Sequence, residues 1–184
     1  GHASSVCALL LPSGPLFIAD AFLNVDPDAD ELVAITEASI DFVKQFGVEP
    51  KVALLSHSNF GSSDTEATRR MRDCLPLIRE RDPELEVEGE MHGDAALDAG
   101  IRMQVFPNAR MREDANLLIF PTLDAANIAF NLLKTAAGDG VTIGPVLLGM
   151  NLPVNVLQMG TSVQSIVNLA AITALRAQGD QFIF

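Results

Sequence analysis

Residues 51–63 read KVALLSHSNFGSS, an apolar run followed at once by a polar loop. Val52 to Leu55 are apolar without alternation, which is typical of a strand covered on both faces of its sheet. A helix is predicted to begin near Asp64, beyond the polar loop, and to end before Pro83. A buried strand that passes through a loop into a helix is the repeating unit of an α/β domain.

Similar elements are predicted on both sides of this segment. A turn rich in Pro and Gly predicts an upstream hairpin, and the spacing of Asp28 and Glu31 predicts a helix that starts with a capping box. The predicted elements are a hairpin of Val6–Leu11 and Leu16–Ile18, strands Val87–Met91, Leu117–Phe120 and Val141–Leu148, and helices Asp28–Phe46, Asp94–Met103, Asp124–Thr135 and Ser162–Ala177. Their order predicts a layered α/β domain with a mixed, largely parallel sheet.

Loops at the carboxyl ends of the strands are the first candidates for a binding site, because ligands of such sheets lie there. Three loops qualify, at residues 56–63, 121–127 and 149–162.

The final predicted helix is apolar around most of its circumference. Val, Ile, Leu and Ala recur through residues 162–177, and Thr161 and Gln164 are spaced as a capping box at the start. A helix that is apolar on every side is buried against more than one neighbour. We therefore expect another part of the chain, or a missing partner, to cover its outer face.

The composition indicates a globular protein and excludes two classes of partner. The 184 residues are 48% hydrophobic and carry a net charge of −12 at pH 7. Such an acidic surface repels polyanions, so neither nucleic acid nor an anionic membrane is expected to bind. No run approaches the roughly 20 apolar residues that a membrane helix needs.

The amino terminus and the cysteines favour a cytoplasmic protein. No secretory signal is evident, and Cys7 and Cys74 fall inside a predicted strand and a predicted helix, where buried, reduced thiols are expected. Gly1 and His2 resemble the scar that protease removal of a tag leaves. Residues 1–5 are therefore expected to be this scar and a flexible start.

The loop at residues 56–63 could present hydroxyl and N–H groups to a phosphate. It matches neither G-x-x-x-x-G-K-[ST] nor G-x-G-x-x-G, however, and hydroxyl-rich turns before helices usually only cap them. Ser56 and Ser58 flank His57, but neighbours in an extended segment point apart and no G-x-S-x-G elbow is present. A hydrolase triad is not indicated.

Other polar groups have simple structural interpretations. The histidines and cysteines lack metal-ligand spacing, so no zinc site is expected. Asp94 and Asp98 share one predicted helical face, where two carboxylates are more often a solvated surface than a general acid and base. Arg69, Arg70 and Arg72 form a basic cluster that is most simply a solvated face. The acids expected to balance it are Asp64, Glu66 and Asp73.

Four segments, in order along the chain, resemble segments of phosphate acetyltransferases. They are KVALLSHSNFGS at 51–62, NLLIFPTLDAAN at 116–127, IGPVLLG at 143–149 and PVNVL at 153–157. The variants SHSNFGSS, GEMHGDAALD and LDAANIAFNLLK look most like the version of this domain that is fused to the C-terminus of long bacterial NADP-dependent malic enzymes. Four matches in order are more specific than any one of them.

The resemblance implies an α/β/α fold like that of phosphate acetyltransferases and isocitrate dehydrogenases, of which this chain contains only part. Residues 6–157 would form the second lobe. Residues 158–178 would supply the C-terminal helix that packs on the absent first lobe, and residues 179–184 a tail. An absent lobe would explain why the final helix is apolar all round.

The chain differs from the family at the residues that the resemblance identifies as catalytic. In the family these residues transfer an acetyl group between phosphate and coenzyme A. In the family, P-V-N-x-L is followed by S-R-G and then an aspartate: the serine stabilises the thiolate, the arginine stabilises the developing oxyanion charge, and the aspartate is the base. Here Gln158, Met159 and Ser165 occupy these positions, and Gly160 is kept. Amide, thioether and hydroxyl groups cannot replace this chemistry, and residues 135–175 contain no Lys or Arg. We therefore expect no transferase activity.

The resemblance instead implies regulation. In malic enzymes of this kind the domain is regarded as an oligomerising module that responds to acetyl-CoA and inhibits malate decarboxylation at a separate site. A coenzyme-shaped cleft can persist without catalysis, because it binds through shape, apolar contacts and backbone hydrogen bonds. The residues expected to line it are Ser56, Asn59, Gly61, Ser62, Asn127, Gly144, Pro145, Gln158, Met159, Gly160 and Thr161.

Cofactors and partners follow from the same resemblance. This domain is expected to hold no cofactor and no metal, whereas NADP and a divalent metal are expected in the malic-enzyme domain, which converts malate to pyruvate and CO2. A homo-oligomer is expected, a dimer through this lobe that also contacts the malic-enzyme domain of the same chain. Two alternatives stay open: an active phosphate acetyltransferase with an altered site, and a ligand-free oligomerisation scaffold.

Overall fold

Strands and helices alternate along the folded chain as its sequence predicts. A computed structural model describes residues 1–138, 141–157 and 159–179. The strands are β1 (Ser4–Leu11), β2 (Gly14–Ala19), β3 (Lys51–Leu55), β4 (Glu86–Met91), β5 (Leu117–Ile119) and β6 (Val141–Leu148). The helices are α1 (Ala29–Gln45), α2 (Glu66–Arg81), α3 (Gly93–Leu97), α4 (Ala99–Val105), α5 (Leu123–Ala136) and α6 (Val163–Gln178).

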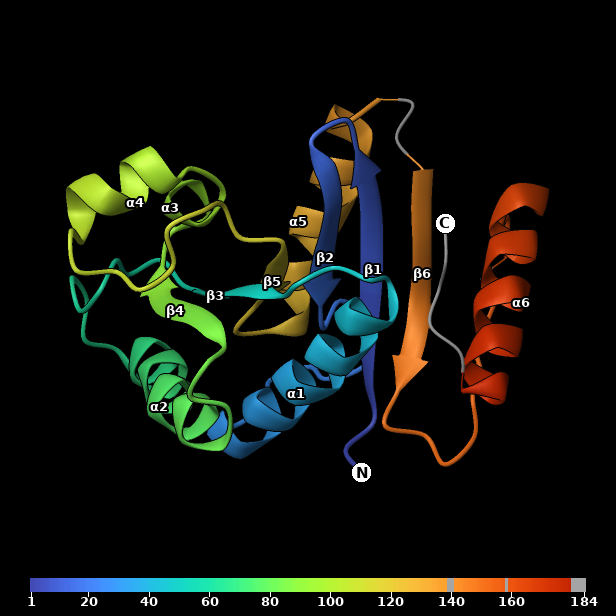
Figure 1. Cartoon of the computed structure of the whole chain (residues 1–184), viewed down its shortest axis with the longest axis horizontal. Coiled ribbons are helices and arrows are strands. Elements are labelled where there is room, and N and C mark those ends of the chain that lie inside the picture. Colours follow the sequence, from blue (N-terminus) through green and yellow to red (C-terminus); the bar gives the residue numbers. More distant parts are fainter. Residues whose placement is uncertain (139–140, 158, 180–184) are drawn as a thin grey trace.

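The described strands form one mixed sheet in the order β4-β3-β5-β2-β1-β6 (Figure 1). The pairs β4–β3, β3–β5 and β5–β2 are parallel, whereas β1 is antiparallel to both β2 and β6. Of the strands described, only β1 therefore runs in the opposite direction, because it is the first arm of the hairpin. The carboxyl ends of the other strands lie at one edge of the sheet.

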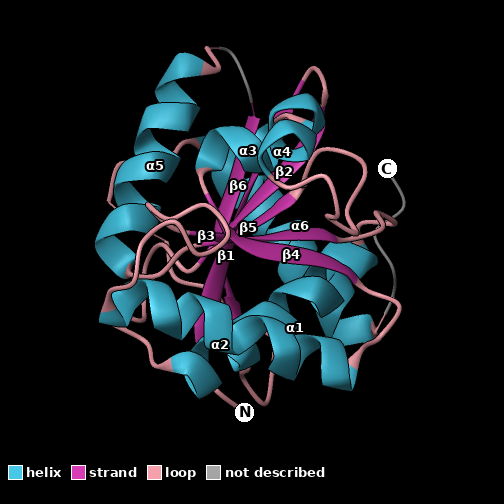
Figure 2. Ribbon diagram, turned by 90° about the vertical axis from the view of Figure 1, so that its left-hand side faces the viewer, coloured by secondary structure: helices cyan, strands magenta, loops and turns pink. Residues whose placement is uncertain are grey.

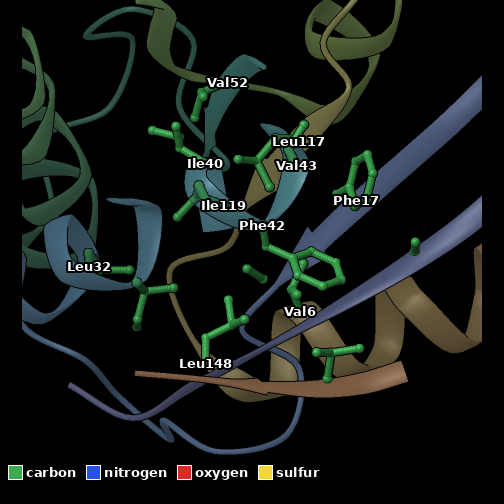
Figure 3. Close-up of a cluster of buried hydrophobic side chains, with 14 of the residues drawn as sticks. Val6, Phe17, Leu32, Ile40, Phe42, Val43, Val52, Leu117, Ile119 and Leu148 are labelled. Atoms are coloured by element: carbon green, nitrogen blue, oxygen red, sulfur yellow. The ribbon is translucent and has the colours of Figure 1, made fainter. Parts of the chain in front are cut away.

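Helices cover both faces of the sheet, as Figure 2 shows from one side. Val52 and Leu54 of β3 enter the cluster beneath α1 and α2, whereas Ala53 and Leu55 enter the cluster beneath α3 and α5. Figure 3 shows the first cluster, in which Phe17 and Phe42 pack edge to face with ring centroids 6.2 Å apart. The predicted α/β/α architecture with a mixed, largely parallel sheet is thus confirmed.

The start of α1 forms as its sequence predicts. Asp28 accepts a hydrogen bond from the Glu31 N–H, and the Glu31 carboxylate accepts one from the Asp28 N–H, which completes the capping box. Gly47 follows the helix with φ of +68°, a conformation that glycine adopts without strain. These local signals fix both ends of the helix.

Two local predictions need correction. The hairpin begins earlier than predicted: Ser4 is fully buried and paired with Leu148, so it belongs to β1 and not to a flexible start. Helix α6 is capped by the hydroxyl of Ser162 and not by a box of Thr161 and Gln164. Helix α2 contains Pro76 and ends at Arg81, before Pro83 as predicted.

The single helix predicted for residues 94–103 is instead two short helices. Asp98 is extended between them, with φ of −140°, and its carboxylate accepts a hydrogen bond from the Ile101 N–H at 3.1 Å. A short carboxylate side chain competes in this way for backbone N–H groups and favours a cap over a helix interior. Asp94 and Asp98 therefore do not share a helical face.

Candidate functional site

The three candidate loops all follow strands that end at the same edge of the sheet, but they do not form one site. Strand β3, which precedes residues 56–63, lies two strand positions from β2 and four from β6. At about 4.8 Å per position, the start of loop 149–162 is roughly 19 Å from the end of β3. The loops after β3 and β5 are neighbours, and the loop after β6 lies apart from them.

A cavity of about 560 Å³ lies at the ends of β3 and β5, between α3 and α5. Ser56 and His57 are the polar side chains in its otherwise apolar lining, so the cavity is suited to an apolar group with few hydrogen bonds. Ser56 is also the predicted site residue that lines it. The lining consists of Leu55, Ser56, His57, Gly93, Leu97, Leu118, Phe120, Pro121, Ala125, Ala129, Leu132 and Leu133.

The polar groups of the 56–63 loop are directed at one another and at β4. The Asn59 carboxamide oxygen accepts a hydrogen bond from the His92 N–H at 2.7 Å, and the Asn59 N–H donates to Ser62 Oγ at 2.9 Å. The Gly61 N–H donates to the Glu90 carboxylate at 2.9 Å. Asn59, Gly61 and Ser62 therefore hold the loop in shape.

The remaining predicted site residues before position 158 lie outside this cavity. The Asn127 amide donates to the Ala21 carbonyl at 3.1 Å and so ties the start of α5 to the end of β2. Gly144 and Pro145 lie in the middle of β6, not at the loop edge. A Cβ atom on Gly144, where φ is +118°, would lie 2.9 Å from the Val6 carbonyl oxygen, so a packed backbone explains this glycine.

Two of the positions that perform acetyl transfer in the family, Met159 and Ser165, lie near the start of α6. Gln158 falls outside the described residues, whereas Met159 is fully solvent-exposed and Gly160 has φ of +85°. Thr161 is half-buried. The Ser165 hydroxyl lies 2.9 Å from the hydroxyl of the N-cap, Ser162. Ser165 thus belongs to the cap of the helix.

A second cavity, of about 520 Å³, lies between α6 and the segment that precedes it. Its described lining contains no charged side chain, so it offers no acid, base or cation to a reaction. Asn155 is fixed at one side of it, with its amide donating to the Thr173 hydroxyl at 2.7 Å. The lining consists of Pro153, Val154, Asn155, Leu157, Ile166, Leu169, Ala170, Thr173, Ala174 and Ala177.

Buried charges are the features that sequence reasoning missed. The Asp20 carboxylate, 4% exposed, accepts hydrogen bonds from the Ser5 hydroxyl and from the backbone N–H groups of Phe22, Leu23 and Asn24. The sequence does hold one signal for the burial of Asp20: this residue directly follows the apolar run of β2 and so lies at the end of a buried strand. Glu88, Glu90 and Arg102 are buried as well.

The arginines of the basic cluster on α2 form ion pairs at the surface, as expected. Only one of the expected acids, Asp64, takes part in them. Carboxylate oxygens of Asp64 lie 2.6 Å from a guanidinium nitrogen of Arg69 and 2.7 Å from one of Arg72. A guanidinium nitrogen of Arg70 lies instead 2.7 Å from a carboxylate oxygen of Asp26. Hydrogen bonds from Arg69, and then the charges of both partner arginines, lower the pKa of Asp64 to about 2. These ion pairs stabilise the start of α2.

Both cysteines are free and buried, as expected. Burial raises the pKa of the Cys74 thiol to about 12 and also raises the pKa of the Cys7 thiol, so neither is a reactive thiolate near neutral pH.

Within the part of the chain that the structure describes, no three His, Cys, Asp or Glu side chains gather as metal ligands. No helix among the described residues is long and apolar enough to cross a membrane.

Comparison with known sequences places residues 1–174 within the family described as "Phosphate acetyl/butaryl transferase". The NADP-dependent malic enzyme of Escherichia coli is 51% identical over 176 residues, which are 96% of this chain and 23% of that protein. The phosphate acetyltransferase of Bacillus subtilis is 36% identical over 86% of this chain and 49% of its own length.

Solved structures agree with the sequence comparison. A phosphotransacetylase from Streptococcus pyogenes matches with a TM-score of 0.91 and 32% identity over 98% of this chain and 55% of that one. The EutD phosphotransacetylase from Staphylococcus aureus matches with a TM-score of 0.88 and 31% identity over 96% of this chain and 55% of that one. The chain therefore spans about half of these structures and less than a quarter of the malic enzyme.

Proposed function

The chain belongs to the phosphate acetyl/butaryl transferase family, and from that premise we propose that it is the regulatory domain of a malic enzyme. In this proposal the domain lacks transferase activity, binds acetyl-CoA and mediates oligomerisation. The malic-enzyme part, with its NADP and divalent metal, belongs to a longer cytoplasmic protein. The 51% identity to part of an NADP-dependent malic enzyme is the observation that most favours this context.

Lack of transferase activity is supported by the chemistry of three positions. A thiol must lose its proton and an oxyanion must be stabilised during acetyl transfer, which requires a base and a cation close together. Gln158, Met159 and Ser165 supply neither, and Ser165 is engaged with the N-cap Ser162. Arg176, the nearest cation along the chain, lies at the other end of α6 and donates to the Leu147 carbonyl at 2.8 Å.

For acetyl-CoA we propose the cavity at the ends of β3 and β5, with Ser56 at its rim. The acetyl group and the short carbon segments of a pantetheine arm are apolar, as is most of the cavity, and the hydroxyl and imidazole groups at one side can hydrogen-bond to its amides. Residues 159–161 would form a second contact region, because the sheet order separates the segment after β6 from this cavity. Inhibition then requires that acetyl-CoA bind one conformation of the full enzyme better than another.

Filling the cavity tests this assignment. Ala129 lines the cavity and is half-buried, whereas Ala136 is exposed on the last turn of the same helix. Ala129→Phe in the full-length enzyme should abolish acetyl-CoA binding in calorimetry and acetyl-CoA inhibition of malate decarboxylation. Ala136→Phe, the matched control, should leave both intact. Unchanged inhibition in the Ala129→Phe variant would remove the cavity from the proposal.

We also propose that the part of the family fold outside this chain covers α6. Val163, Ile166 and Val167 form an apolar stripe on the outer side of that helix, with exposed fractions of 77%, 40% and 56%. Exposed apolar patches of this kind mark interaction surfaces. This chain covers 55% of the Streptococcus pyogenes structure, and the other 45% of that structure is material enough for a further lobe.

For the dimer we propose the outer face of α5. Ile128 on that helix is 59% exposed and, unlike Leu132, does not line the proposed acetyl-CoA cavity. A two-fold interface needs a self-complementary patch, which one apolar helix face per subunit can supply.

A direct assay distinguishes the proposed domain without transferase activity from an active phosphate acetyltransferase. The full-length protein, given acetyl phosphate and coenzyme A, should form no acetyl-CoA above a blank, whereas a phosphate acetyltransferase run in parallel should. Clear turnover would establish the alternative. The scaffold alternative would instead show an oligomer that depends on this domain and no acetyl-CoA binding by calorimetry.

A further inference from the structure

Glu90 places a carboxylate inside the chain's own 56–63 loop. Its side chain is 1% exposed. One carboxylate oxygen accepts hydrogen bonds from the Ser58 hydroxyl at 2.7 Å and from the Gly61 N–H at 2.9 Å, and Arg72 Nη1 lies 3.9 Å away. A hydroxyl, a backbone N–H and a guanidinium around one oxygen are the groups that proteins use to hold a phosphate.

The backbone of the loop directs two successive N–H groups at Glu90. Phe60 and Gly61 both have positive φ angles, of 48° and 88°, in a turn of the kind whose N–H groups can bind an anion. The Phe60 N–H donates to the Glu90 carbonyl at 2.7 Å, next to the bond from Gly61 to the carboxylate. Both N–H groups are therefore used by one residue of β4.

Every other backbone donor of the loop from 58 to 63 is also engaged. The Ser58 N–H donates to Ser56 Oγ and the Asn59 N–H to Ser62 Oγ. The Ser62 and Ser63 N–H groups donate to the Asn59 carbonyl and to Ser58 Oγ. A phosphate would have to displace these bonds and approach two carboxylates, Glu90 and the Asp64 that pairs with Arg72.

We propose that the 56–63 loop is an anion-binding loop whose binding position is occupied by the chain's own Glu90, which thereby excludes phosphate groups. The loop is then a fixed wall beside the apolar cavity, and a phosphate-bearing ligand of that cavity must place its phosphates elsewhere. An anion of phosphate size enters only when the Glu90 carboxylate is removed. The inference stands whether or not acetyl-CoA binds.

Inorganic phosphate added to the Glu90→Ala chain tests the proposal. Removing the carboxylate leaves the Ser58 hydroxyl, the Gly61 N–H and Arg72 around an empty position. At about tenfold excess of phosphate over its Kd, the melting temperature should rise about 3 °C more than that of the wild type under the same conditions. The wild-type comparison removes the general stabilisation that phosphate salts give to folded proteins.

Two further measurements make the result decisive. Glu90→Gln fills the same space with an amide and should gain no phosphate-specific stabilisation. In 15N NMR spectra, the Gly61 amide of the wild-type chain should not respond to phosphate, and that of Glu90→Ala should shift to saturation. A saturable Gly61 shift in the wild type, or no gain in a folded Glu90→Ala chain, would overturn the proposal. If Glu90→Ala does not fold, a saturable Gly61 shift in the wild type still overturns the proposal.

Discussion

Asp64 shows how a single residue can organise its surroundings without burial. It is an exposed carboxylate that holds two arginines of α2, and hydrogen bonds from Arg69 are the main cause of its low pKa. The sequence identified the basic cluster and this acid. It could not distinguish Asp64 and Asp26, which are paired, from Glu66 and Asp73, because pairing depends on how the loops before α1 and α2 approach that face.

The Asp64 interaction predicts a specific pH dependence. Its pKa is lowered from the ordinary value of 3.8 to about 2 in the folded chain. The resulting stabilisation should therefore be fully present above about pH 4 and should be lost as the pH falls toward 2. The 13C NMR titration of the carboxyl group should have its midpoint near 2, and Arg69→Gln should raise it. A midpoint near 3.8 in the wild type would contradict the ion pair.

At the scale of elements, periodicity and capping signals in the sequence predict the positions of the strands and helices. The attachment of α3 and α4 to the rest of the fold depends instead on one buried arginine. The Arg102 guanidinium donates to the carbonyls of Ala95 at 2.8 Å, Ala96 at 3.3 Å and Met111 at 3.3 Å, and also to that of Glu113. It therefore joins α3 to the segment before β5. A helical pattern in the sequence does not reveal such a contact, because its acceptors are backbone atoms 6 to 11 residues away.

Replacing Arg102 should destabilise the fold strongly. Arg102→Ala leaves several buried carbonyls without donors, and we expect a loss of about 3 kcal/mol or more in the free energy of unfolding. Arg102→Lys should recover only part of it, because an ammonium group lacks the planar fork of donors. Urea unfolding measures the loss, with the exposed Arg112→Ala as the control. An Arg102→Ala chain as stable as the Arg112→Ala chain would show that these bonds contribute little.

At the scale of the whole molecule, α6 is a helix that leaves an apolar side exposed. Leu169 and Ile172 are buried toward the sheet, while Val163 and Val167 face outward and are exposed. The sequence indicated that the helix is apolar on all sides. Only the fold shows which side is covered within this chain and which is not.

A charged side chain on the outer side of α6 should therefore leave the stability of the 184-residue chain nearly unchanged and should destabilise the full-length protein. Val167→Lys should change the stability of the 184-residue chain by no more than about 0.5 kcal/mol, because the side chain is 56% exposed. In the full-length protein the same lysine would be buried without a partner, which lowers the melting temperature. Gln178→Lys, at the exposed end of the helix, is the control. Equal effects in both proteins would indicate that nothing covers this face.

The sequence by itself determined the architecture: the buried run at 52–55, the Asp28 capping box and the order of strands and helices depend on local periodicity and backbone hydrogen bonding, which a linear pattern records. Tertiary structure alone decided the site. The strand order separates the loop after β6 from the loops after β3 and β5, and it brings Glu90 of β4 under the loop after β3. Strand order arises from how distant segments pair to bury both faces of the sheet, and no local pattern contains that pairing.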